Sequence, residues 1–156
     1  MTTTRKGRGM SNDKRVTEDL IETLRDGQEG FADAAEKLAG SDRPELATQM
    51  RDFSQQRAAF ADELDALAAD YGDDADDSGS VAGTVHRVWM SLKDSLSGSG
   101  PGGVLDAAEQ GEDHAVAEYE KALSADISDG LRSVVQRQFD QVRQAHDQVR
   151  ALRDAA

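Results

Sequence analysis

The sequence contains no cysteine, only two prolines and few aromatic residues, and each shortage narrows the range of folds. The lack of cysteine excludes disulfides, thiolate metal sites and cysteine nucleophiles, and it leaves the redox compartment undetermined. Aromatic residues make up 4% of the 156 residues, so the core must consist mainly of leucine, valine and alanine on helices. No apolar run approaches the roughly 20 residues of a membrane span, so we expect no membrane association.

Positive charge is also scarce, and it is concentrated at one end of the chain. The formal net charge is −13, but residues 1–15 carry five basic residues and one acidic residue, so the remainder sums to −17. A body this acidic repels phosphate backbones, so the folded domain is not expected to bind nucleic acid. Residues 1–15 are predicted to be a disordered basic leader. They lack the apolar segment of a signal peptide, which predicts a cytoplasmic location.

Apolar residues recur at helical spacing along the rest of the chain, which predicts one helical domain over residues 16–154. Pro44 and Pro101 both stand where a helix can begin. An acidic loop before the third segment partly matches a calcium-binding loop, but Val85 stands where a bidentate glutamate is required, so a solvated turn is expected. The predicted helices cover about 16–39, 43–71, 80–97, 102–125 and 129–153.

The four long helices each have one polar residue near the midpoint of an otherwise apolar stripe. These residues are Gln28, Arg57, Glu112 and Gln138. Antiparallel hairpins bring helix midpoints to a common level, so the four side chains are predicted to form one buried polar layer. In the alternative interpretation, the long Arg57 side chain extends outward to solvent, and Gln56 or Glu63 flanks the seam instead.

The segment between the second and fourth predicted helices can span the length of the bundle, which gives ferritin-like topology with a single crossover. A ferritin-like di-metal site needs a Glu from two helices and a Glu-x-x-His from each of the other two. No Glu-x-x-His exists here, because Gly83, Gly111 and Arg143 stand three residues before the histidines. Arg57 would repel a metal but neutralise Glu112. We therefore expect no metal, cofactor or catalytic residue, with iron or manganese binding as the alternative.

The remaining candidates carry weaker signals. His86 and Trp89 lie on neighbouring lines of the crossover helix and are predicted to line a pocket, although a histidine that simply packs there is the plainer interpretation. His114 is expected to face away from the seam, and His146 to lie at the edge of the last stripe. Glu109 and Glu112 form a carboxylate pair, but without a second acid-base partner they do not predict catalysis.

Five segments of the sequence resemble a bacterial family of small ferritin-like four-helix-bundle proteins of unknown function. They are LIETLRDGQEGFADAAE (20–36), SQQRAAFADEL (54–64), SGSVAGTVHRVWMSLK (78–93), GEDHAVAEYEKAL (111–123) and AHDQVRALRD (145–154). The resemblance implies the ferritin-like fold and a cytoplasmic bacterial setting, and it implies no established activity. The family's characteristic segments include the positions of Gln28, Arg57, His86, Trp89 and Glu112.

Taken together, these patterns predict an all-α, ferritin-like four-helix bundle with a short extra helix in its crossover. The predicted function is that of a small soluble, non-enzymatic binding or stress-associated structural protein. The alternatives are an unconventional metal-binding protein that stores or oxidises iron, and a partner-binding module that uses Trp89. A homo-oligomer is compatible with each of these, and the protein partner is unknown.

Overall fold

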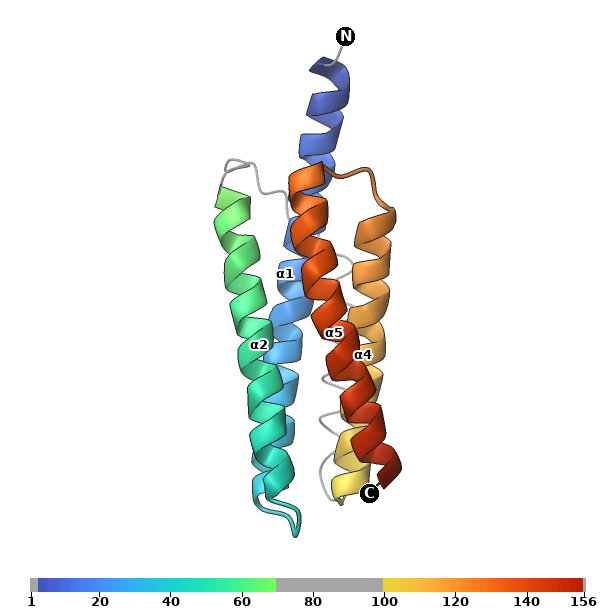
Figure 1. Ribbon diagram of the computed structural model, residues 1–156. Coiled ribbons are helices and arrows are strands. Elements are labelled where there is room, and N and C mark those ends of the chain that lie inside the picture. The colour runs from blue at the N-terminus through green and yellow to red at the C-terminus, as the bar shows by residue number, and fades with distance from the viewer. Residues whose placement is uncertain (1–2, 70–99, 156) are drawn as a thin grey trace.

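The computed structural model describes residues 3–69 and 100–155, with side chains from residue 12 onward. Within these ranges the protein is all-α and has no strand. Figure 1 shows the helices side by side as an elongated bundle. They are α1 (Thr3–Ala39), α2 (Glu45–Ala68), α4 (Pro101–Ser124) and α5 (Asp129–Ala155). None of the described helices is long and apolar enough to cross a membrane.

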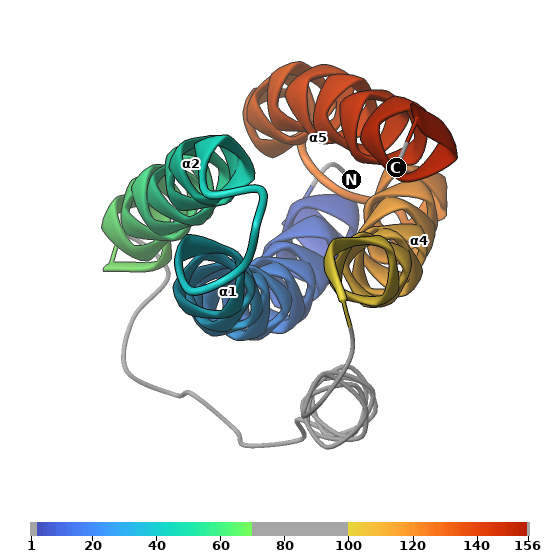
Figure 2. The same cartoon turned by 90° about the horizontal axis from the view of Figure 1, so that it is seen from below.

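Two of these helices run in each direction. In Figure 1, α1 and α5 descend, whereas α2 and α4 ascend. The end of α2 and the start of α4 therefore lie at opposite ends of the bundle. Seen along the bundle in Figure 2, α1 lies between α2 and α4, and α5 closes the fourth corner. The parallel direction of α2 and α4 was expected from the sequence, and the structure has it.

The crossover itself falls outside the described part of the chain. The helix predicted over about 80–97 lies outside the described residues, as does the acidic loop before it. The pocket expected at His86 and Trp89 therefore stays a prediction.

The first helix begins much earlier than the sequence suggests. A disordered leader is predicted over residues 1–15, whereas α1 begins at Thr3. Two contacts hold this part of α1 on the turn between α4 and α5: Asn12 Nδ2 donates to the Asp126 carbonyl oxygen at 2.9 Å, and Asp13 Oδ1 accepts from the Ser128 backbone N–H at 2.8 Å. The start of a helix has N–H groups without intrahelical partners, and a carboxylate is well suited to satisfy one of them.

Hydroxyl groups fix two of the helix ends. Ser41 donates to the Leu38 carbonyl oxygen and accepts from the Arg43 N–H, which closes the turn between α1 and α2. At the start of α5, the Leu131 N–H donates to Ser128 Oγ at 3.3 Å. Pro101 occupies the first turn of α4, where its missing N–H has no cost. These short connections hold each pair of helices as an antiparallel hairpin.

The apolar core consists of two clusters, one in each half of the bundle. The cluster nearer the α1–α2 turn includes Phe31, Leu38, Leu46, Met50, Leu105 and Val149. The cluster nearer the α4–α5 turn includes Leu20, Leu24, Leu64, Leu131, Val135 and Val142. On α4 the clusters are separated between Ala108 and Ala115, which places Glu112 at the level where they meet.

Candidate functional site

An ion pair between α2 and α4 lies at the level where the two core clusters meet. Arg57 NH1 donates to Glu112 Oε1 at 2.5 Å, and Arg57 NH2 donates to Glu112 Oε2 at 2.6 Å. The Arg57 side chain is 1% exposed and that of Glu112 is 0% exposed. One guanidinium thus engages both oxygens of one carboxylate, a planar two-bond geometry for which arginine is well suited.

The first helix provides the surface against which Arg57 packs. The Phe31 ring centroid lies 5.2 Å from Arg57 Cζ, within range of a cation–π contact. Gly27, one turn earlier on α1, faces the Arg57 stem, because a Cβ built there would lie 3.7 Å from Arg57 Cγ. The arginine is therefore enclosed by α1 and α4 and does not extend outward to solvent as the alternative interpretation proposed.

A second polar group lies two helical turns away along α4. The Tyr119 hydroxyl donates to Gln138 Oε1 at 2.7 Å, and Gln138 Nε2 donates to Glu63 Oε1 at 2.8 Å. Tyr119 and Gln138 are fully buried. Glu63 also pairs with Arg137, whose side chain is 54% exposed, so this chain of contacts leads from the core to the surface. Burial raises the pKa of the Tyr119 hydroxyl well above its usual range, so this group stays neutral.

The remaining member of the predicted polar layer lies near the edge of the bundle. Gln28 is half-buried, and its Oε1 accepts from Arg25 NH1 at 3.2 Å. Arg25 in turn pairs with Asp62 and Asp65 on α2. In the described contacts, the Gln28 side chain joins this exposed cluster and not the Arg57–Glu112 pair.

The predicted four-residue layer is therefore divided in the structure. Glu112 lies at the level of Val142 and Ala145 on α5, where the two apolar clusters meet, and Gln138 lies further toward the start of α5. Because α4 and α5 are antiparallel, a shift toward the start of α5 corresponds to a shift toward the end of α4, which brings Gln138 to Tyr119. The physical reason for the difference is that helix midpoints define a common level only to within a turn or two.

The central residues do not fit a ferritin-like di-metal centre. Such a centre needs several carboxylates and imidazoles directed at the ions. The carboxylate at this level in the described helices is that of Glu112, and both of its oxygens accept hydrogen bonds from the Arg57 cation. A divalent ion at this place would have to displace a buried guanidinium and leave it without a counter-charge, which is strongly unfavourable.

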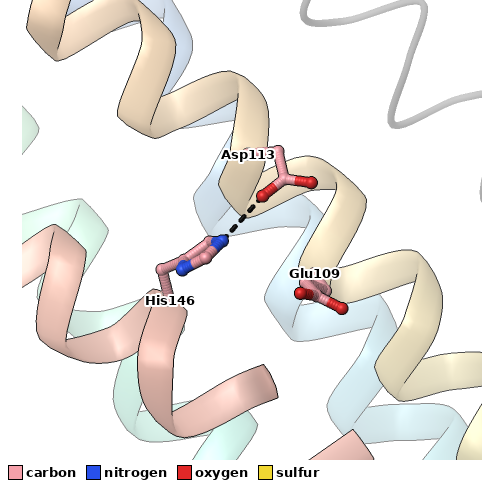
Figure 3. Close-up of side chains that lie close together, drawn as sticks. All are labelled: Glu109, Asp113 and His146. Carbon is pink, nitrogen blue, oxygen red and sulfur yellow. Dashed lines mark hydrogen bonds and ion pairs between the residues drawn. The ribbon is translucent and has the colours of Figure 1, made fainter.

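A separate group of potential metal ligands lies between α4 and α5, nearer the surface. Glu109, Asp113 and His146 each offer one ligand atom, and these atoms all lie within 4.8 Å of one another. Figure 3 shows Glu109 and Asp113 on successive turns of α4, with His146 facing them from α5. His146 Nε2 lies 2.6 Å from Asp113 Oδ1, and its Nδ1 lies 3.3 Å from Asp147 Oδ1.

Two arginines of α5 also contact Glu109, which is 4% exposed. Arg150 Nε donates to Glu109 Oε2 at 2.8 Å, and Arg153 lies in ion-pair contact with Oε1. Within the described part of the chain, that Oε1 atom accepts no hydrogen bond of regular geometry. The carboxylate is thus neutralised by cations that are themselves partly exposed.

The sequence indicates Glu109 and His146 as separate candidates and does not predict that they lie together. The available signal was the four-residue spacing of Glu109 and Asp113 on α4, which places both carboxylates on one face. Only the pairing of α4 with α5 shows that His146 faces them. His114, the other described histidine, is half-buried and lies outside this group.

Fold and site together define an all-α four-helix bundle with a buried ion pair where the two halves of its core meet. The chain belongs to the DUF2383 family, a domain of unknown function, whose family model matches residues 15–125. The matched part includes Arg57, Glu112 and Asp113, but it ends before α5 and so excludes His146. A search of curated proteins finds no match.

Proposed function

We propose that this DUF2383 protein is a non-enzymatic bundle of ferritin-like topology that acts through its surface, as a binding or stress-associated structural protein. The observation that carries the proposal is the Arg57–Glu112 pair at the centre of the bundle. In a metal-dependent bundle enzyme, the carboxylates at this level hold the reactive ions. In this protein the Arg57 guanidinium stands where those ions would lie, so we infer that the interior serves to hold the helices together.

The direction of the helices supports the ferritin-like part of the proposal. The parallel direction of α2 and α4 supports a four-helix bundle with one crossover, because the end of α2 and the start of α4 lie at opposite ends of the bundle. The resemblance described above implies a bacterial and cytoplasmic setting, and we adopt both in the proposal. The short extra helix in the crossover is also part of it.

The charge of the chain indicates what the surface would bind. Residues 16–156 sum to −17, whereas residues 1–15 sum to +4. Such a surface attracts partners with basic patches and repels nucleic acids and other polyanions. A basic segment of a second copy meets the same requirement, so self-association through the basic end of α1 is compatible with this role.

Iron loading tests the proposal against the alternative of iron storage or oxidation. Untagged wild-type protein and the variant Arg57→Met/Glu112→Leu, both stripped of metal, are mixed with Fe²⁺ in air. The proposal predicts that neither protein accelerates iron oxidation above the buffer control, and that no iron retained by the wild type depends on Glu112. The double variant replaces the ion pair with apolar side chains of similar volume and is therefore expected to fold. Glu112→Ala alone is a poorer comparison, because it leaves Arg57 as an unpaired buried charge.

The iron-handling alternative predicts a different result. If the wild type oxidises iron or retains about two ions per chain, and the folded double variant does neither, the centre of the bundle is a metal site. The non-enzymatic proposal is then wrong, and the iron-handling alternative takes its place.

A further inference from the structure

We propose that Glu109, Asp113 and His146 bind one divalent transition-metal ion of the Zn²⁺ type between α4 and α5. This inference goes beyond the proposed function, because the site lies away from the Arg57–Glu112 pair and nearer the surface. The three ligand atoms already lie within 4.8 Å of one another (Figure 3). Ligands about 2.0–2.2 Å from a tetrahedral ion stand about 3.4 Å apart, so only small side-chain movements are needed to close the site.

The ligand set suits such an ion. One imidazole nitrogen and two carboxylate oxygens leave a fourth position for water, as in three-ligand zinc sites. Imidazole together with carboxylate favours first-row transition metals over Mg²⁺ and Ca²⁺, which prefer oxygen ligands alone. The ligands come from two rigid helices, with Glu109 and Asp113 one turn apart on α4 and His146 opposite them on α5.

The contacts of His146 give an independent reason to expect a cation. Both ring nitrogens face carboxylates: Nδ1 lies 3.3 Å from Asp147 Oδ1, and Nε2 lies 2.6 Å from Asp113 Oδ1. A neutral imidazole carries one N–H and can donate to only one of them. In one tautomer Nε2 donates to Asp113 Oδ1. In the other, Nδ1 donates to Asp147 and the unprotonated Nε2 faces Asp113 Oδ1, which is the arrangement that a cation bound between the two atoms would stabilise. A carboxylate on the distal nitrogen is also the usual support of a metal-bound histidine.

The contacts of Glu109 with two arginines also suit a metal ligand. Arg150 Nε holds Oε2 at 2.8 Å, the kind of contact that orients a ligating carboxylate. The other oxygen, Oε1, is buried and accepts no regular hydrogen bond in the described structure, although Arg153 lies beside it. Arg153 also contacts Asp106 and Asp154, and its side chain is 36% exposed, so it has other partners when it leaves Glu109. We therefore interpret Arg153 as a built-in competitor of the ion.

The test is Zn²⁺ binding to untagged, metal-free full-length protein by titration calorimetry, with Co²⁺ absorption as the report on the ligands. We expect one Zn²⁺ per chain in the wild type, and an affinity lowered about tenfold or more in His146→Gln and in Glu109→Gln. The matched controls are His114→Gln and Glu120→Gln, which remove a histidine and an exposed acid from α4 outside the ligand set and should leave the affinity within about threefold. Arg153→Ala should bind more tightly than the wild type, because Glu109 loses its competitor.

Three outcomes would overturn the inference: no Zn²⁺ binding to the wild type, equal binding to His146→Gln, or equal weakening by the two controls. The first means that a proton alone joins His146 to Asp113, and the others mean adventitious binding to an acidic surface. Circular dichroism shows whether each variant is folded. If Glu109→Gln is unfolded, the comparison of His146→Gln with the wild type still decides the question. If Zn²⁺ does not bind at this site, the proposed function still stands. That function is tested separately, by whether iron oxidation or retention depends on Glu112.

Discussion

Arg57 is a cation in an apolar seam, and its energetics depend on a single carboxylate. Removing both charges from water costs several kcal/mol per ion, and their attraction in the interior repays this only when the hydrogen-bond geometry is good. The two short bonds between Arg57 and Glu112 meet that condition. Such a pair adds little net stability compared with apolar residues, yet neither partner can be removed alone without a large cost.

Tyr119 is expected to make the protein less stable as the pH rises into the alkaline range. Burial raises the pKa of its hydroxyl, so the folded state keeps a proton that the unfolded chain releases above about pH 10. The unfolded state then binds fewer protons, and the free energy of unfolding falls with rising pH, by up to about 1.4 kcal/mol per pH unit for this group.

The matched variant is Tyr119→Phe, which loses the hydrogen bond to Gln138 at every pH but has no hydroxyl to ionise. Urea denaturation of both proteins at pH 8 to 11 should show a steeper alkaline loss in the wild type. Tyr71 is present in both and cancels in the comparison. Parallel pH curves would contradict a neutral, buried hydroxyl at this position.

At the scale of the helices, α1 packs against the Arg57 side chain at Gly27 and leaves some space there. Gly27 lies against the Arg57 stem, and a glycine inside a helix costs roughly 0.5–1 kcal/mol relative to alanine. A Cβ at Gly27 would lie 3.7 Å from Arg57 Cγ and 3.8 Å from NH1, which are ordinary van der Waals distances. The close approach of α1 to Arg57 therefore leaves room for one methyl group.

Gly27→Ala is accordingly expected to raise the free energy of unfolding by about 0.5–1 kcal/mol, measured by urea denaturation. Gly27→Leu is the contrasting variant, because its longer side chain needs space that Arg57 occupies, and it should destabilise the protein by about 1–3 kcal/mol. A loss of stability in the alanine variant would mean that α1 packs more tightly on Arg57 than these distances indicate.

For the molecule as a whole, hydrophobic periodicity predicted the helices and their directions much better than it predicted the contacts between side chains. The all-α class, the four long helices and the parallel direction of α2 and α4 follow from apolar stripes and connection lengths, and the structure has each of them. The start of α1 did not follow, because residues 3–15 have no apolar stripe. The contacts of Asn12 and Asp13 with the α4–α5 turn are tertiary, and no local pattern announces them.

The candidate sites show the same limit at a finer level. A polar residue inside an apolar stripe indicates a buried group, and Arg57, Glu112 and Gln138 are buried. Which of them touch depends on how α5 is shifted along α4, and a shift of about two turns places Gln138 beside Tyr119 instead of in one layer with Arg57 and Glu112. The grouping of Glu109, Asp113 and His146 depends on that same shift, which a single sequence does not encode in any local pattern.

The central claim is that Arg57 and Glu112 form one buried unit, and a double-mutant cycle tests it most directly. The four proteins are the wild type, Arg57→Met, Glu112→Leu and the double variant, compared by urea denaturation. Each single change strands a buried charge and should cost about 3–5 kcal/mol, and the double change should recover most of that loss. The exposed pair Arg25–Asp62 is the matched control, with losses below about 1 kcal/mol. Single losses below about 1 kcal/mol at Arg57 and Glu112 that simply add would contradict the account.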